Sequence, residues 1–146
     1  NRGILHIELG DNYLAVSDFS KAIKYDGKNK LAYYNRGIAK SNLKDIHGAI
    51  ADYTKAIEVD SEYANSYYNR GIEKFELEDY YGAISDYTKA IEIDSNYINA
   101  YLNRSISKEK IGDIKGACLD AKKIISLGNT DSQNEKWVRD NCDYQT

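Results

Sequence analysis

The feature that most constrains this chain is a pattern that repeats every 34 residues. Residues 35–68 align with residues 69–102 without a gap and are identical at 22 of the 34 positions. Unrelated segments of that length would share roughly two. A unit this short cannot bury a core alone, so its copies must stack and form a core between neighbours. The dipeptide Asn-Arg marks the four blocks at Asn1-Arg2, Asn35-Arg36, Asn69-Arg70 and Asn103-Arg104.

Each block has the pattern of two helices joined by a short polar break. Apolar residues recur at helical spacing in both halves of a block, for example Leu31, Tyr34, Ile38 and Leu43, then Ala49, Ile50, Tyr53, Ala56 and Ile57. The chain contains no proline, which would interrupt such helices. An aspartate in each break suits the start of the following helix, and we expect left-handed glycines to end two second helices. These residues are Asp11, Asp45, Asp79 and Asp113, then Gly27 and Gly128.

The repeat resembles the tetratricopeptide repeat, whose signature sets an aromatic residue, a glycine, an alanine and a second aromatic residue at fixed places. The matching residues are Tyr33, Gly37, Ala49 and Tyr53, then Tyr67, Gly71, Ala83 and Tyr87, and more loosely Tyr101, Ala117 and Ala121. The resemblance implies an all-α fold, a right-handed superhelix of antiparallel helix pairs. It implies one domain over 1–146, with a partial repeat at 1–29, repeats at 30–63, 64–97 and 98–131, and a capping helix at 132–146.

The C-terminal segment departs from the repeat. Ser132 and Glu135 have the spacing of a capping box, and an apolar side of the segment would close the last repeat. We expect Trp137 to lie against the helix that contains Cys118 and Ala121. Cys118 and Cys142 are too few for a disulfide framework, and we interpret them as small, partly buried apolar residues in preference to a disulfide or a reactive thiol.

Composition and motifs exclude several classes of function. The net charge of −3 comes from interspersed charges, so no basic stripe marks a nucleic-acid binder, and no apolar run is long enough to cross a membrane. His6 and His47 have no partner at metal-ligand spacing, and no nucleophile, phosphate-binding or zinc motif occurs. We therefore expect no enzymatic activity, no metal and no cofactor.

A second regularity joins the two helices of each block. An arginine stands 16 residues before an aspartate throughout, as in Arg36–Asp52, Arg70–Asp86 and Arg104–Asp120. These arginines occupy a site where the family has leucine, and a buried guanidinium needs an anionic partner. We interpret the carboxylates as halves of structural ion pairs and not as acid–base groups.

The resemblance also implies a binding surface, because first helices line the concave face of tetratricopeptide folds. That face would present Asn35, Asn69 and Asn103, with Tyr34, Tyr68, Ile38, Ile72 and Ile106 beside them. Asparagine amides can pair with the main chain of a peptide, although they can equally bridge neighbouring helices. The basic residues of the family's carboxylate clamp are missing, since the corresponding sites read Leu31, Tyr34, Asn65, Asn69 and Asn99.

These observations predict a scaffold or adaptor that binds a peptide segment of a partner protein in its groove. The alternative is a structural module that associates with itself through an uncapped N-terminal face. The chain has no methionine at position 1, so we expect the natural start to lie upstream. That leaves the compartment open, with the cytoplasm as the default expectation.

Overall fold

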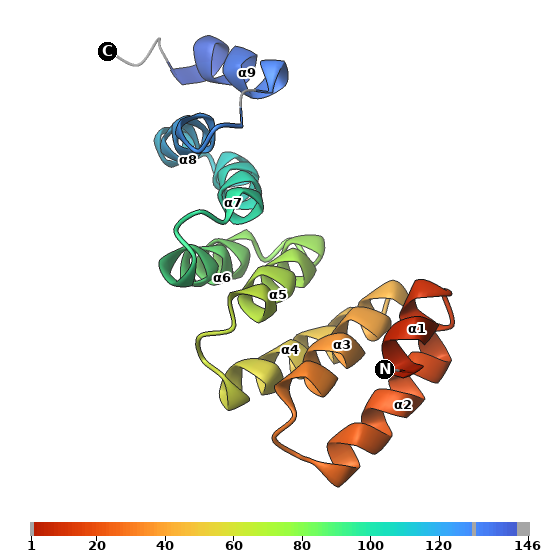
Figure 1. The fold of residues 1–146 in the computed structure, drawn as a ribbon. Coiled ribbons are helices and arrows are strands. Elements are labelled where there is room, and N and C mark those ends of the chain that lie inside the picture. The colour runs from red at the N-terminus through yellow and green to blue at the C-terminus, as the bar shows by residue number, and fades with distance from the viewer. Residues whose placement is uncertain (1, 130, 143–146) are drawn as a thin grey trace. The chain divides into compact units, whose positions relative to one another are not determined.

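The chain folds into helices alone in the part that the structure, a computed structural model, describes: residues 2–129 and 131–142. This confirms the predicted all-α class. Short turns join consecutive helices (Figure 1). The helices are α1 (Arg2–Glu8), α2 (Asn12–Tyr25), α3 (Lys30–Asn42), α4 (Ile46–Val59), α5 (Ala64–Glu76), α6 (Tyr80–Ile93), α7 (Ile98–Lys110), α8 (Ile114–Ser126) and α9 (Ser132–Cys142).

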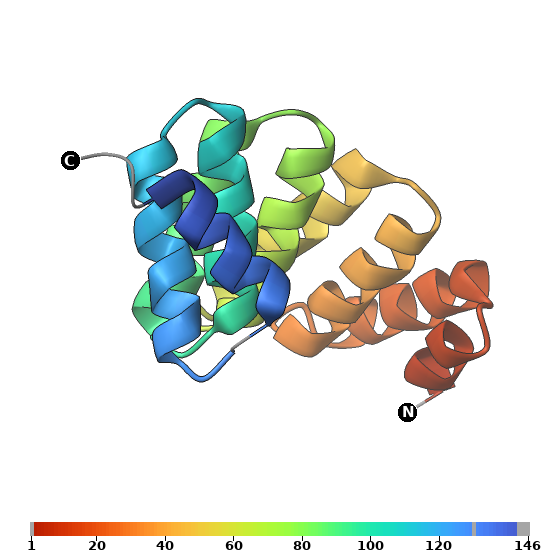
Figure 2. The same ribbon diagram turned by 90° about the horizontal axis from the view of Figure 1, so that it is seen from above.

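The helices group into two compact units that divide within α5, at residues 1–73 and 74–146. In the first unit, α2 packs against α1 and α3, and α3 packs against α4. In the second unit, α7 packs against α6 and α8, and α9 packs against α8 (Figure 2). In both units a helix contacts its neighbours along the chain, which is the packing that a short repeat requires.

Aspartates in the breaks start three of the second helices, as predicted. The side chains of Asp45, Asp79 and Asp113 each accept a hydrogen bond from a backbone N–H three residues later, at 2.9–3.0 Å. The residue at that third position is glycine in all three helices, and a Cβ there would lie 2.1 Å from Oδ2, the other carboxylate oxygen of the capping aspartate. Asp11 also stands at the start of α2, as expected, but its side chain makes no capping hydrogen bond there.

The first helices end in a left-handed residue at the same place in every block. Gly10 and Gly112 have φ of +81°, and Lys44 and Glu78 have φ of 63° and 60°. The residue after each of them donates its N–H to a carbonyl five residues earlier, which satisfies the end of the helix. Gly128 is left-handed, as expected (φ +90°), but Gly27 is not: Asp26 ends α2 with an extended backbone and bonds to the carbonyl of Ala22.

Small residues and aromatic rings build the core. Tyr53 and Tyr87 are 2% and 1% exposed, and the alanines around them are buried. A Cβ on Gly37 would lie 2.6 Å from the ring of Tyr53. Glycine is therefore needed in the first helix so that the ring of the second can pack against its backbone.

The C-terminal helix is held to the last repeat by a disulfide. Cys118 of α8 and Cys142 of α9 are bonded, with their Cα atoms 5.6 Å apart. The interpretation of these cysteines as unbridged apolar residues is therefore wrong. The sequence does not reveal the pair because α9 turns back onto α8, which brings together residues 24 apart. Val138 is the buried residue of α9, and the position of Trp137 against α8 stays a prediction.

The start of α9 also differs from the expected capping box. The helix begins at Ser132, and Asp131 precedes it. The carboxylate of Asp131 accepts from the N–H of Gln133, and its carbonyl accepts from the N–H of Glu135. Asp131 therefore takes the capping role that the sequence pattern assigned to Ser132.

Candidate functional site

The repeated arginines and aspartates meet between the helices of a block. Arg36 donates from Nε and Nη2 to the two carboxylate oxygens of Asp52, at 2.8 and 2.6 Å. Arg104 holds Asp120 in the same way, at 2.8 and 2.5 Å. Both aspartates are almost fully buried, and the hydrogen bond to Asp52 raises the pKa of the Arg36 guanidinium. Arg70 and Asp86 belong to different units, so their pairing stays a prediction.

In the second, third and fourth blocks a lysine also contacts the repeated aspartate, and this contact was not predicted from the sequence. Lys40, Lys74 and Lys108 each place Nζ 2.8 Å from the aspartate of their block. The signal was available, since each lysine lies four residues after the repeated arginine and therefore on the same face of the first helix. Asp52 and Asp120 thus each bind two cations, an arginine and a lysine.

The first block has His6 at the position of these lysines. Its Nε2 lies 3.7 Å from Asp18, and its Nδ1 lies 3.8 Å from Asp11. His6 is half-buried and lies between the first two helices of the chain. His47 is exposed. No group of three or more potential metal ligands forms in the described part of the chain.

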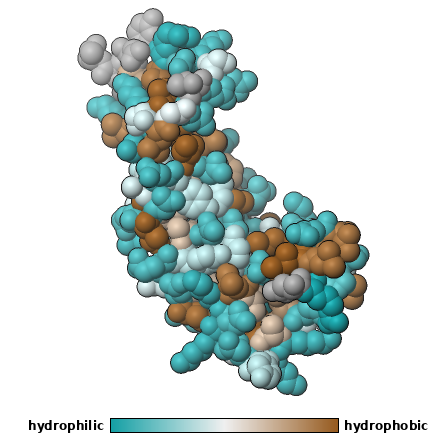
Figure 3. Space-filling model, in the orientation of Figure 1, coloured by the Kyte–Doolittle hydropathy of each residue, from teal (hydrophilic) through white to brown (hydrophobic). Residues whose placement is uncertain are grey.

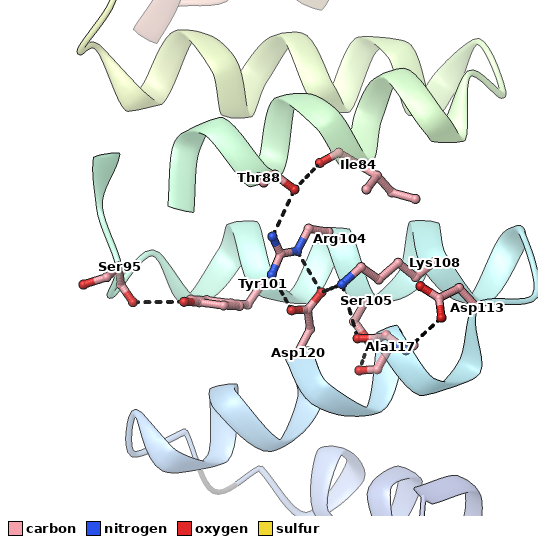
Figure 4. Close-up of polar contacts among 11 residues, drawn as sticks. Ile84, Thr88, Ser95, Tyr101, Arg104, Ser105, Lys108, Asp113, Ala117 and Asp120 are labelled. Atoms are coloured by element: carbon pink, nitrogen blue, oxygen red, sulfur yellow. Dashed lines mark hydrogen bonds and ion pairs between the residues drawn. The ribbon is translucent and has the colours of Figure 1, made fainter. Parts of the chain in front are cut away.

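The arginines also connect neighbouring blocks through a hydroxyl group. Arg36 donates to Ser20, Arg70 to Thr54 and Arg104 to Thr88, each at 3.0 Å. Each guanidinium also lies over a tyrosine ring three residues earlier in its own helix, at 5.5–5.7 Å. Figure 4 shows the Arg104 set, where the guanidinium lies between Thr88 on one helix and Asp120 on another. These polar groups satisfy one another, as structural ion pairs must.

The predicted binding residues lie on the first helices. In the first unit, the side-chain amide of Asn69 on α5 donates to the hydroxyl of Tyr34 on α3, at 3.1 Å. The ring of Tyr34 packs against Tyr53 and, edge to face, against Tyr63. Burial raises the pKa of Tyr34, so this hydroxyl stays protonated at neutral pH. Of the three predicted asparagines, Asn69 therefore bridges two helices, which is the alternative role that the sequence left open.

The other predicted residues are partly accessible. Asn35 lines a cavity of about 330 Å³ together with Arg2, Phe19 and Leu31. Ile38, Tyr68 and Ile72 are half-buried in the first unit. In the second unit, Asn103 is half-buried and Ile106 is 38% exposed on α7. These side chains place amides and apolar groups together on the first helices.

Antiparallel helix pairs that stack through glycine and alanine define the class of helical-repeat proteins. The sequence model of the tetratricopeptide repeat matches residues 1–29, 31–63 and 64–97. The chain therefore belongs to the tetratricopeptide repeat family. Proteins of this family generally mediate protein–protein interaction and are generally scaffolds without enzymatic activity. No curated protein sequence gives a significant match.

Solved structures show the same fold. MamA is 22% identical with a TM-score of 0.86, over 97% of this chain and 88% of that chain. The TPR domain of OM64 from Arabidopsis is 29% identical with a TM-score of 0.70, over 76% of this chain and 94% of that chain. The first TPR of Spaghetti (RPAP3), bound to the HSP90 peptide SRMEEVD, is 22% identical with a TM-score of 0.71, over 79% of this chain and 91% of that chain.

No helix in the described residues is long and apolar enough to span a membrane.

Proposed function

We propose that this chain is an adaptor that binds an extended peptide segment of a partner protein along the first helices of its repeats. The observation that carries the proposal is the half-buried amide of Asn35, at the edge of a cavity with apolar and polar walls. An amide offers two donor hydrogens and an acceptor oxygen, which match the C=O and N–H of a peptide main chain. The peptide-bound neighbour supports the same general use of the fold.

The chemistry of the surface indicates how it would recognise a segment. Asn69 donates one hydrogen to Tyr34 and also contacts the buried Tyr53 hydroxyl, so two tyrosines fix the position of this amide. Ile38 and Ile72 supply apolar contacts on the same helices. Leu31, 51% exposed, stands at one of the sites where the family's carboxylate clamp is basic. The proposed ligand is therefore a segment held by its main chain and apolar side chains, with weak dependence on salt.

The test begins with peptides selected from a random displayed library against the folded chain. Asn35→Ala should weaken binding of a selected peptide about tenfold, the loss expected for neutral hydrogen bonds. Its melting temperature should not change. Glu58→Ala, at an exposed residue of α4 outside this surface, is the control and should leave the affinity unchanged. Unchanged peptide affinity in a folded Asn35→Ala protein would show that the first helices do not form the peptide-binding surface.

A second candidate function is self-association, which a different observation favours. Apolar side chains at the N-terminal end are unusually exposed, with Leu5 at 51%, Leu9 at 65% and Tyr13 at 80%. Monomeric proteins rarely leave a contiguous apolar patch of this kind uncovered. Sedimentation of the chain at rising protein concentration tests the candidate, and a constant monomer mass would reject it.

A further inference from the structure

The disulfide between α8 and α9 opens onto a hollow at the surface of the second unit. The hollow has a volume of about 290 Å³ and is lined by Lys115, Cys118 and Leu119 of α8 and by Cys142 of α9. Both cysteines are half-buried, Lys115 is exposed, and Leu119 is 70% exposed. A small thiol can therefore enter the hollow and approach the disulfide while both helices stay folded.

The exposure of this surface is a property of the repeat. In the two preceding blocks the residues at the positions of Lys115 and Leu119 are exposed as well, although further helices follow them in the chain: His47, Ala51, Tyr81 and Ser85. Cys118 replaces an isoleucine that is half-buried in those blocks, Ile50 or Ile84. The hollow thus lies on a side of the second helices that stays accessible where further blocks follow.

Lys115 places a cation beside the disulfide. It stands three residues before Cys118, on the same face of α8, and lines the hollow together with it. Cys142 is the last residue of α9, where the unpaired carbonyl groups of a helix end disfavour negative charge. These surroundings therefore favour a thiolate on Cys118 over a thiolate on Cys142.

Few apolar contacts besides the disulfide hold α9 to α8. Among the described residues of α9 only Val138 is buried, and Trp137 is half-buried. Figure 3 shows mostly hydrophilic side chains over this helix. A helix of 11 residues is marginal in water by itself. Breaking the S–S bond should therefore release α9 from α8 and unfold it.

We propose that this disulfide is a site of thiol–disulfide exchange that controls the attachment of α9, with a small thiol as the reductant. The small thiolate attacks the sulfur of Cys142 and forms a mixed disulfide there. The electron pair of the broken bond stays on Cys118, which leaves as a thiolate beside Lys115, and a better stabilised thiolate leaves faster. None of these residues belongs to the proposed peptide-binding surface.

A second small thiolate completes the reaction. It attacks the outer sulfur of the mixed disulfide, forms the oxidised disulfide of the small thiol and releases the thiolate of Cys142. Two small thiols are thus oxidised to one disulfide, and their two protons pass to Cys118 and Cys142.

The first experiment identifies the sulfur that is attacked. The folded chain is exposed to 2-mercaptoethanol without denaturant, and iodoacetamide stops the reaction at short times. Peptide mapping by mass spectrometry should find mercaptoethanol on Cys142 and the alkyl group on Cys118. Mercaptoethanol on Cys118 would overturn the assignment of the leaving thiolate. Reduction no faster than global unfolding of the chain under the same conditions would overturn the exchange site itself.

A pair of charge substitutions tests the part played by Lys115. Lys115→Met should slow the first exchange step about two- to fivefold, the rate equivalent of one exposed charge. Arg139→Met is the matched control, because Arg139 also stands three residues before a cysteine of the pair but does not line the hollow. It should leave the rate unchanged. Equal rates in the Lys115→Met and parent proteins would contradict stabilisation of the leaving thiolate by this cation.

Trp137, the only tryptophan in the sequence, reports the release of α9. Its fluorescence emission should shift to longer wavelength when excess 2-mercaptoethanol reduces the disulfide, because the half-buried ring becomes solvated. Cys142→Ser is the control, since it should show the shifted emission from the outset and no further change on addition of the thiol. Full reduction without a shift in emission would show that packing alone holds the helix, and would overturn the control of its attachment by exchange.

Discussion

At the scale of single residues, the repeated arginines and their polar partners hold neighbouring blocks together. Each arginine of the network bonds to a hydroxyl of the preceding block, and Arg36 and Arg104 also hold an aspartate of their own block. The aspartate also holds a lysine. Fixed directions of these bonds allow only one register between neighbouring helices, which hydrophobic contact alone does not specify.

Asp52→Ala should be among the most destabilising substitutions in the first unit. It would leave Arg36 and Lys40 without their shared carboxylate, at a site where Asp52 is 3% exposed. Breaking a buried pair in this way costs about 3–5 kcal/mol. Urea unfolding measures the loss. The control is Glu58→Ala, whose pair with Lys55 is more than half exposed and should be worth less than about 1 kcal/mol.

Lys30 and Asp60 make a testable pH-dependent contact. The hydrogen bond from Lys30 holds the pKa of Asp60 below its ordinary value. Its contribution to stability is therefore complete above the unfolded pKa of about 3.9 and is lost as the pH falls through the folded pKa. Lys30→Met should raise the pKa of Asp60, as measured by NMR titration of its carboxyl carbon. Lys28→Met, at an exposed residue nearby, should leave that titration unchanged.

At the scale of the helices, the turn inside each block places a left-handed residue at one position. Glycine fills it in the first and last blocks, whereas Lys44 and Glu78 fill it in the middle blocks. A side chain in this conformation costs roughly 1 kcal/mol, which glycine avoids. The middle turns are therefore strained relative to the outer ones, although the hydrogen bonds that end the helix are the same.

Lys44→Gly should consequently stabilise the protein by about 0.5–1 kcal/mol, because relief of the left-handed side chain outweighs the added freedom of the unfolded chain. Gly112→Ala should destabilise it by a similar amount for the converse reason. A steric clash does not contribute to this loss, because nothing lies within 4 Å of a Cβ built on Gly112. Chemical denaturation of both variants measures the two shifts, and shifts of the same sign would contradict the strain.

At the scale of the whole molecule, stability should be distributed along the chain. Helices of a unit contact chiefly their sequence neighbours, so a local change weakens its own block and those beside it. In the second unit the disulfide adds a covalent link between α8 and α9, which joins residues 24 apart in the sequence.

Cys142→Ser should therefore act locally. Loss of a loop constraint of this length costs about 3 kcal/mol in the chain-entropy model. Hydrogen exchange should accelerate in α9 and α8 and stay unchanged in α1–α4. Alkylation followed by mass measurement supplies the control, because the unreduced parent protein should carry no free thiol. Uniform acceleration across all helices would show one cooperative unit instead.

The repeat, the helix pairs and the positions of the interhelical ion pairs could all be predicted from the amino-acid sequence. These follow from spacing: a 34-residue period, a helical apolar stripe and a constant interval of 16 between Arg36 and Asp52 or Arg104 and Asp120. The lysines at the same aspartates were readable too, because they obey the same period.

Contacts that have no counterpart from block to block could not be predicted in this way, because they depend on how the helices pack. Cys118 meets Cys142 because α9 folds back on α8. Asn69 of α5 bonds to Tyr34 of α3 because these two first helices come close together at these residues. This asparagine therefore joins two helices and is also a candidate peptide-binding residue. Leu5 is exposed, whereas Ala39 at the same repeat position is buried. Periodicity states which residues are equivalent, but burial depends on what packs against each copy.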